Sequence, residues 1–187
     1  MLKKADKFTW TQGVVEKKER GKMEKKPAEL PRSLLIVSLR PDPYARMKAG
    51  TKQHEFRRRF TDQPADAYLY IPVPVGAIAA YAEFGRPFRG TPEELAAIAE
   101  QGEPGSYAET LEYLDGVEYG FAVPVLSVQP IEPLALHEMR EAFSFAPPRS
   151  SRRLEVGSAL ERELAGRLAA ARKGSIPGNR MQREEEL

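Results

Sequence analysis

The chain has 187 residues, of which 41% are hydrophobic and 30% are charged, and its formal net charge is +2. These values are typical of a globular protein with one sizeable core, and they exclude a wholly disordered chain. The absence of cysteine excludes disulfide bridges, thiolate metal ligands and a cysteine nucleophile. Because the chain also has only two histidines, we expect neither a metal nor a cofactor.

Residues 1–32 form a basic N-terminal extension, with 10 Lys or Arg against 5 Asp or Glu. A short apolar patch at Phe8, Trp10, Val14 and Val15 is compatible with a small hairpin. The extension lacks the apolar core of a signal peptide, and no part of the chain approaches the ~18 apolar residues of a membrane helix. We therefore expect a cytoplasmic protein that has no membrane partner.

Five apolar or alternating runs predict β-strands, over residues 34–39, 54–60, 67–73, 76–84 and 119–128. Short helices are expected over residues 43–49, 91–100, 106–114 and within 133–143. The clearest helix start is at Thr91, a capping residue that is followed by Pro92 and, three positions later, by Glu94. Strands and helices do not alternate regularly, which favours a small α+β domain with an antiparallel or mixed barrel.

Pro147 and Pro148 mark the end of the main domain, which we place at residues 33–154. Leu160, Leu164 and Leu168 then recur every four residues and predict an amphipathic helix within residues 155–174. This stripe could pack on the barrel or on a second copy of the chain, which would form a homodimer. The composition of residues 175–187 predicts a disordered tail.

Positive charge is concentrated on residues 40–59, which contain 7 basic and 2 acidic side chains within an otherwise acidic middle region. Focused charge of this kind attracts anionic ligands. In the predicted strand, Glu55, Arg57 and Arg59 project from one face, whereas Phe56 and Phe60 project from the other and can anchor the strand. Because charged groups are rarely buried unless they are paired, the charged face is expected to be exposed or to line a polar pocket.

The same segment follows a strand, an Arg-Pro step and a short helix with the pattern G-x-K-x-x-E-x-R, at Gly50, Lys52, Glu55 and Arg57. This arrangement resembles the ASCH family of PUA-like domains. The later strands, the acidic helical insertion and the proline-rich exit over residues 145–150 come in a similar order, so the resemblance covers about residues 33–154. It implies a small PUA-like β-barrel, mixed and mostly antiparallel, with short helices around it and a cleft at one mouth.

Members with this barrel recognise RNA or modified bases, so the resemblance implies RNA or a nucleotide-like ligand as the partner. Some small members look like amidohydrolases that deacylate a modified cytidine, and some are ribonucleases. In the deacylating members, a threonine that looks like the nucleophile stands three positions after the lysine, where this chain has Glu55. This departure argues against the same mechanism. The acidic residue that those enzymes use cannot be matched within residues 94–112.

The candidate ligand-binding residues lie on this charged segment: Arg40, Tyr44, Lys52, Glu55, Arg57 and Arg59. Lys52, a catalytic candidate, could contact a phosphate or serve as a general base if its pKa is lowered. Glu55, the second catalytic candidate, could accept a hydrogen bond from a base or could pair with Arg57. Arg57 and Arg59 suit bidentate contacts with phosphate or a base, whereas Tyr44 could stack on a base or pack on the barrel.

Three functions follow as alternatives. The first is a binding module for RNA or a nucleotide, whose footprint Arg149, Arg152 and Arg153 would widen through phosphate contacts. The second is an enzyme, an amidohydrolase or nuclease that acts on a modified nucleoside or RNA. The third is a regulatory adaptor that docks through its C-terminal helix.

Overall fold

The computed structural model describes residues 31–174. The apolar patch and nearly all of the basic extension, as well as the predicted tail over residues 175–187, lie outside the described part of the chain. The expectations for those two segments therefore stay predictions.

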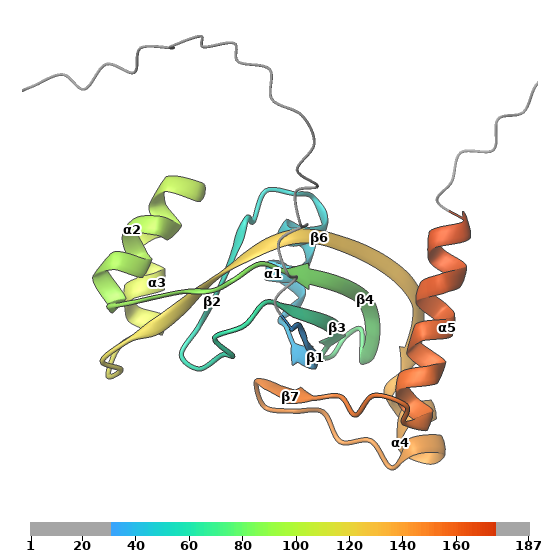
Figure 1. Ribbon diagram of the computed structural model, residues 1–187. Helices are drawn as coiled ribbons and strands as arrows, with labels where there is room; N and C mark the ends of the chain where they lie inside the picture. Colours follow the sequence, from blue (N-terminus) through green and yellow to red (C-terminus); the bar gives the residue numbers. More distant parts are fainter. Residues whose placement is uncertain (1–30, 175–187) are drawn as a thin grey trace, which may run out of the picture.

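Seven strands form one curled, mixed sheet that closes about half of a barrel (Figure 1). They are β1 (Ser33–Ser38), β2 (His54–Arg57), β3 (Ala65–Ile71), β4 (Ala77–Phe84), β5 (Phe88–Gly90), β6 (Gly120–Ala135) and β7 (Ser151–Arg153). Their order is β2-β6-β4-β3-β1-β7, and β5 pairs with β6 beside this path. Only β1 and β3 run parallel among the described pairs, so the predicted mixed, mostly antiparallel α+β fold is confirmed.

Five helices surround the sheet in the described part of the chain. They are α1 (Pro41–Lys48), α2 (Pro92–Gly102), α3 (Tyr107–Tyr113), α4 (Leu136–Phe143) and α5 (Ala159–Gly174). Figure 1 shows α2 and α3 together at one end of the molecule and α4 and α5 at the opposite end. Within residues 31–174, no helix has both the length and the apolar character that crossing a membrane requires.

The two faces of the sheet contribute to separate cores. Successive side chains of a strand point to opposite faces. In β1, Leu35 and Val37 accordingly join a cluster that includes Met47 of α1, whereas Ile36 joins a cluster that includes Leu164 of α5. The sheet is therefore covered by α1 on one face and by α5 on the other, and α1 is fixed close to β1.

The leucine stripe of α5 packs on the chain's own sheet, the first of the two arrangements expected for it. Leu160, Leu164 and Leu168 are buried in the same cluster as Tyr68 and Tyr81 of the central strands. A homodimer through this helix stays a prediction. It would have to use the other faces of α5, because the stripe is already covered.

The helix start predicted at Thr91 is confirmed. The Thr91 hydroxyl accepts a hydrogen bond from the Glu94 backbone N–H at 3.3 Å, and the Glu94 carboxylate accepts one from the Thr91 N–H at 2.9 Å. This reciprocal capping box satisfies two backbone donors at the first turn of α2. It therefore fixes where α2 begins.

β6 is longer than predicted. The predicted strand ended at residue 128, but β6 continues to Ala135 and α4 begins only at Leu136. Proline cannot donate to a strand ladder and is unusual inside a strand, yet β6 contains Pro130 and Pro133. They are tolerated because this half of β6 pairs only with β4 in the described chain, and because a register shift next to Ala80 adjusts the ladder.

β2 is shorter than predicted, ending at Arg57 rather than at residue 60. Its partner β6 begins at Gly120, just before Phe121, which pairs with Arg57, so the ladder runs out. The chain then bends at Arg58, whose guanidinium donates to the backbone carbonyl of Asp115. The expected alternation of side chains along one face therefore stops at Arg57.

β5 and β7 were not predicted. Each has three residues, which is too few for an alternating pattern to be visible in the sequence. β7 matters for the site, because its antiparallel pairing with β1 returns the chain from the proline-rich exit to the edge of the sheet.

We predict that Leu164→Ala lowers the free energy of unfolding by about 2–5 kcal/mol, because the Leu164 side chain is fully buried between α5 and the sheet. Urea unfolding followed by circular dichroism measures the loss. Leu126→Ala is the matched control: it removes the same atoms from a side chain that is 61% exposed, and should change the free energy by less than about 0.5 kcal/mol. Equal losses would contradict this packing of α5.

Candidate functional site

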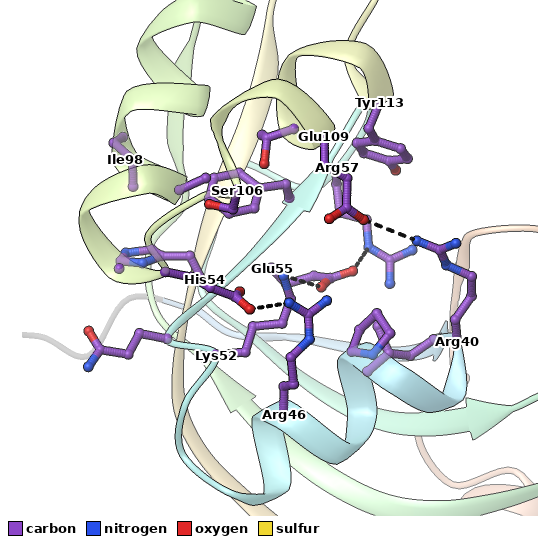
Figure 2. Close-up of a pocket in the computed structure, with 18 of the residues that line it drawn as sticks. Arg40, Arg46, Lys52, His54, Glu55, Arg57, Ile98, Ser106, Glu109 and Tyr113 are labelled. Atoms are coloured by element: carbon purple, nitrogen blue, oxygen red, sulfur yellow. Dashed lines mark hydrogen bonds and ion pairs between the residues drawn. The ribbon is translucent and has the colours of Figure 1, made fainter.

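A pocket of about 290 Å³ lies between β2 and the α2–α3 pair (Figure 2). Residues 51–57 form its floor, and Arg40, Pro43 and Arg46 on or next to α1 form one side. Residues of α2 and α3 form the facing wall, and Arg149 reaches the pocket from the loop before β7. Its charged lining side chains are five basic and three acidic: Arg40, Arg46, Lys52, Arg57 and Arg149 against Glu55, Glu103 and Glu109. The pocket therefore has an excess of two positive charges.

The end of α1 determines where Lys52 lies. Gly50 has a φ of +75°, a left-handed conformation that glycine adopts without strain and that ends the helix. The backbone N–H groups of Thr51 and Lys52 both donate to the Arg46 carbonyl, at 3.0 and 3.2 Å. This turn places Lys52 at the entry to β2, two residues before its first strand position.

Glu55 and Arg57 form a buried ion pair on β2, with residue exposures of 7% and 6%. Arg57 Nε lies 2.9 Å from Glu55 Oε1, although its N–H is not aligned for a hydrogen bond. The other guanidinium nitrogens of Arg57 donate to the Ser38 carbonyl at 2.9 Å and to Ser150 Oγ at 3.3 Å. Arg57 thus connects β2 to the end of β1 and to the returning chain before β7.

Lys52 lies on the other side of Glu55, as Figure 2 shows. Its side chain is 12% exposed, and Nζ lies 3.9 Å from Glu55 Oε2 and 5.4 Å from the centre of the Phe56 ring. Burial lowers the pKa of Lys52, and the Glu55 carboxylate opposes this effect. Because 3.9 Å is too long for a hydrogen bond, the ammonium group keeps donors that a ligand can use.

The facing wall is built by the α2–α3 connection. Gly105 has a φ of +89°, and the Glu100 carboxylate accepts hydrogen bonds from the backbone N–H groups of Gly105 and Tyr107, at 2.9 and 3.0 Å. These backbone donors lower the pKa of Glu100. Ser106 of the connection and Thr110 of α3 line the pocket, and the buried Ser106 hydroxyl has no hydrogen-bond partner among residues 31–174.

Close packing holds this wall beside the floor. At Gly120, an added Cβ would lie 2.9 Å from a methyl group of Leu114 and 3.1 Å from the Arg57 carbonyl oxygen, so only glycine fits without a shift. Leu95, Leu114 and Phe56 belong to one small apolar cluster beneath the two helices. The helices are therefore fixed against the strand that bears Glu55 and Arg57.

Ion pairs cross the mouth of the pocket between α1 and the α2–α3 pair. Arg46 contacts the Glu103 carboxylate and also pairs with Asp42 at 3.0 Å. Arg40 lies 4.0 Å from Glu109, and both side chains are mostly exposed. Figure 2 shows Arg40 and Arg46 extending from the α1 side toward the helices opposite.

The structure brings together four of the six predicted ligand-binding residues, namely Arg40, Lys52, Glu55 and Arg57. Tyr44 is half-buried and packs on the core instead of lining the pocket, and burial raises its pKa. Arg59 is exposed beyond the end of β2 and does not line the pocket. Of the expected charged face, only Glu55 and Arg57 reach the pocket.

Several lining residues were not predicted: Arg46, His54, Ser106, Glu109, Thr110 and Tyr113. His54 begins β2 at the pocket edge, and burial and the nearby Lys52 lower its pKa. Residues of α3 gave no local signal, because only the packing of the helix insertion brings them opposite β2. Among residues 31–174, no cluster of histidine and acidic side chains has an arrangement that could hold a metal ion.

We predict that Glu55→Gln lowers the pKa of Lys52 further, because burial then acts without the opposing carboxylate. An NMR titration of the Lys52 side-chain ¹³Cε resonance in both proteins measures this change. In the wild type, the native state binds this proton less tightly than the unfolded state, where lysine titrates near 10.5. This lysine's contribution to the free energy of unfolding should therefore rise with pH between the lowered pKa and 10.5. A wild-type pKa at or above 10.5 would contradict the burial of Lys52.

Neither models of protein families nor curated proteins give a match to this chain. Solved structures do match this chain. The crystal structure of ASCH from Zymomonas mobilis is 25% identical in sequence and covers 75% of this chain and 96% of its own, with a TM-score of 0.62. A serine-to-alanine mutant of that protein is 26% identical, covers 73% of this chain and 96% of its own, and has a TM-score of 0.62.

A tyrosine-to-phenylalanine mutant of the same protein is 25% identical, covers 72% of this chain and 98% of its own, and has a TM-score of 0.63. This chain thus matches nearly the whole length of these proteins. The curled mixed sheet with its short helices is the architecture that the motif at Gly50–Arg57 had indicated. The chain has an ASCH-like, PUA-like α+β fold.

Proposed function

We propose that this chain binds RNA, or a nucleotide-like ligand, by admitting one base into the pocket above Lys52, Glu55 and Arg57. The observation that supports this most is the buried Lys52–Glu55–Arg57 trio at the pocket floor. Buried charges are costly to maintain, so a trio of them facing an open pocket is more typical of a recognition site than of a structural core.

The size and the lining of the pocket suit one heteroaromatic ring. Its volume of about 290 Å³ is at the lower end of the range of ligand sites, which suits one nucleoside rather than several. Leu39, Pro43 and Ile98 supply apolar surface for the faces of a base, and Tyr113 lies at the opening with 44% exposure. Polar groups at the floor, together with the apolar side chains among the wall residues, match a flat base whose edge is polar.

The hydrogen bonds that the floor residues already form indicate what each residue can do for a ligand. Arg57 already engages Glu55, Ser38 and Ser150, so its main role in the proposal is to hold the Glu55 carboxylate in place. Within residues 31–174, Glu55 Oε2 forms no hydrogen bond and lies 3.9 Å from Lys52 Nζ, so it can accept a hydrogen bond from an amino group of a base. Lys52 then donates to a base carbonyl or a phosphate oxygen.

A hydrolase is a second candidate, because the lowered pKa of Lys52 suits a general base and two hydroxyl groups, of Ser106 and Thr110, line the same pocket. No hydroxyl group among residues 31–174 forms a hydrogen bond with Lys52, as an activated nucleophile would require. The adaptor hypothesis is weaker, because the α5 leucines are covered by the sheet.

We predict that Lys52→Met weakens binding of a labelled single-stranded RNA about 10–100-fold, because it removes a charged donor from the pocket floor. Fluorescence anisotropy at low and moderate salt measures the affinity, with duplex RNA and DNA run in parallel. Lys48→Met removes the same charge from an exposed position on α1 that does not line the pocket, and should change the affinity less than about threefold.

Equal losses in the two lysine variants would show that charge alone drives binding and would contradict the proposed site. We avoid Arg57 variants in this test, because Arg57 joins β2 to Ser38 and Ser150 and its loss would disturb the fold. Recovery of the RNA after incubation distinguishes binding from turnover: shortened RNA in the wild type, absent with Lys52→Met, would favour the hydrolase.

A further inference from the structure

We infer that the mouth of the pocket is a phosphate-binding subsite, in which Arg40 and Arg46 take a ligand phosphate by exchanging it for the carboxylates of Glu109 and Glu103. This inference rests on the proposed function and narrows the ligand to a nucleotide or a nucleic acid, as opposed to a bare nucleoside.

Arg46 is the better-defined half of the subsite. Its side chain is 28% exposed, and it contacts the Glu103 carboxylate from across the pocket mouth. Its Nε is buried and has no hydrogen-bond partner among residues 31–174, so one donor of the guanidinium fork is unused. A buried unpaired donor is costly, and a tetrahedral phosphate offers more acceptor oxygens to such a fork than one carboxylate does.

The helix that ends at Glu103 does not stabilise the negative charge of this residue. Glu103 is the C-cap residue of α2, where the helix dipole disfavours a negative charge, and the last turn of α2 has no basic residue to offset it. Its interaction partner is Arg46 of α1, on the other side of the pocket. The charge of Glu103 is therefore balanced by Arg46 across the pocket and not by its own helix.

Arg40 and Glu109 repeat this arrangement in a weaker form. The two charged groups are 4.0 Å apart and their side chains are 78% and 68% exposed, so the pair is easily exchanged. Arg149 lines the same opening and forms no ion pair within the described chain. A phosphate that enters from solvent would thus meet three arginines, two of which hold carboxylates in its place.

The position of the subsite agrees with the proposed base site. The pocket floor at Lys52 and Glu55 takes the base edge, and the arginines lie at the mouth, where the sugar and phosphate of an inserted nucleotide would emerge. Glu103 and Glu109 then act as competitors, and their charge lowers the affinity for a phosphate-bearing ligand. Removing this charge should strengthen binding, which is the opposite of what the loss of a purely structural ion pair does.

Isothermal titration calorimetry tests the inference with the four ribonucleosides and their 5′-monophosphates as probes. We expect at least one monophosphate to bind about tenfold or more tightly than its nucleoside. Glu103→Gln combined with Glu109→Gln should strengthen monophosphate binding about two- to fivefold per carboxylate and change nucleoside binding less than twofold. Glu112→Gln, on the exposed part of α3 and outside the pocket lining, is the matched control and should change neither. Arg46→Gln should remove most of the difference between monophosphate and nucleoside.

The remaining outcomes contradict either the phosphate subsite alone or the proposed function together with it. If nucleosides and monophosphates bind equally well, or if the double glutamine variant binds monophosphates no better than the wild type while its thermal midpoint is unchanged, the phosphate subsite is wrong and the base pocket stands. If the double variant is less stable and binds more weakly, the two carboxylates are structural and the inference fails. If neither class of probe binds and short RNA does not bind either, the proposed function fails together with the inference.

Discussion

The buried ion pair between Glu55 and Arg57 is the constraint on which the site depends. Both charged groups are buried, so each needs the opposite charge of the other beside it. Their attraction offsets the cost of desolvation only if the geometry around them is kept. Arg57 satisfies this condition by reaching the Ser38 carbonyl and Ser150, which fixes the edge strand β2 to the end of β1 and to the chain that returns through β7. A pair that is this costly holds the floor of the pocket in one arrangement, and it leaves one carboxylate oxygen of Glu55 and the nearby Lys52 for a ligand.

The rest of the pocket is assembled around this floor by packing between distant segments. α1 covers one face of the sheet through Met47 and presents its arginines at the pocket mouth. The α2–α3 pair closes the other side because Gly120 permits a close approach to Arg57 and because Leu95 and Leu114 pack beneath it. The same helices supply acidic residues that pair with the α1 arginines. One side of the pocket is therefore basic and the other acidic, and the balance between them sets how readily an anion enters.

Local signals in the sequence predicted the elements with strong patterns and the residues that lie close together in the chain. Gly50, Lys52, Glu55 and Arg57 share one turn and one strand, so their spacing was enough to place them together. The sequence did not show which side of α1 faces the pocket, because a helix of 8 residues has few periodic positions. In the structure, Pro43 and Arg46 face the pocket, whereas Tyr44 faces the core. The prediction that Arg59 binds the ligand required β2 to continue beyond Arg57, where its pairing with β6 ends. Glu103 and Glu109 lie 57 or more residues along the chain from the arginines with which they pair, and only the tertiary packing of the insertion brings them together.

The central claim is that a base enters the pocket, and Ile98 offers a direct probe of it. Ile98 is the isoleucine that lines the pocket in the described chain, whereas Ile36, Ile78 and Ile131 lie in the cluster on the far face of the sheet. Methyl NMR of isoleucine-labelled protein during titration with short single-stranded RNA separates these positions. We expect a saturable ring-current shift of the Ile98 δ1 methyl resonance and no comparable change at Ile36, Ile78 or Ile131. RNA binding that leaves Ile98 unchanged, or that shifts the far-face isoleucines instead, would contradict the placement of the ligand in this pocket.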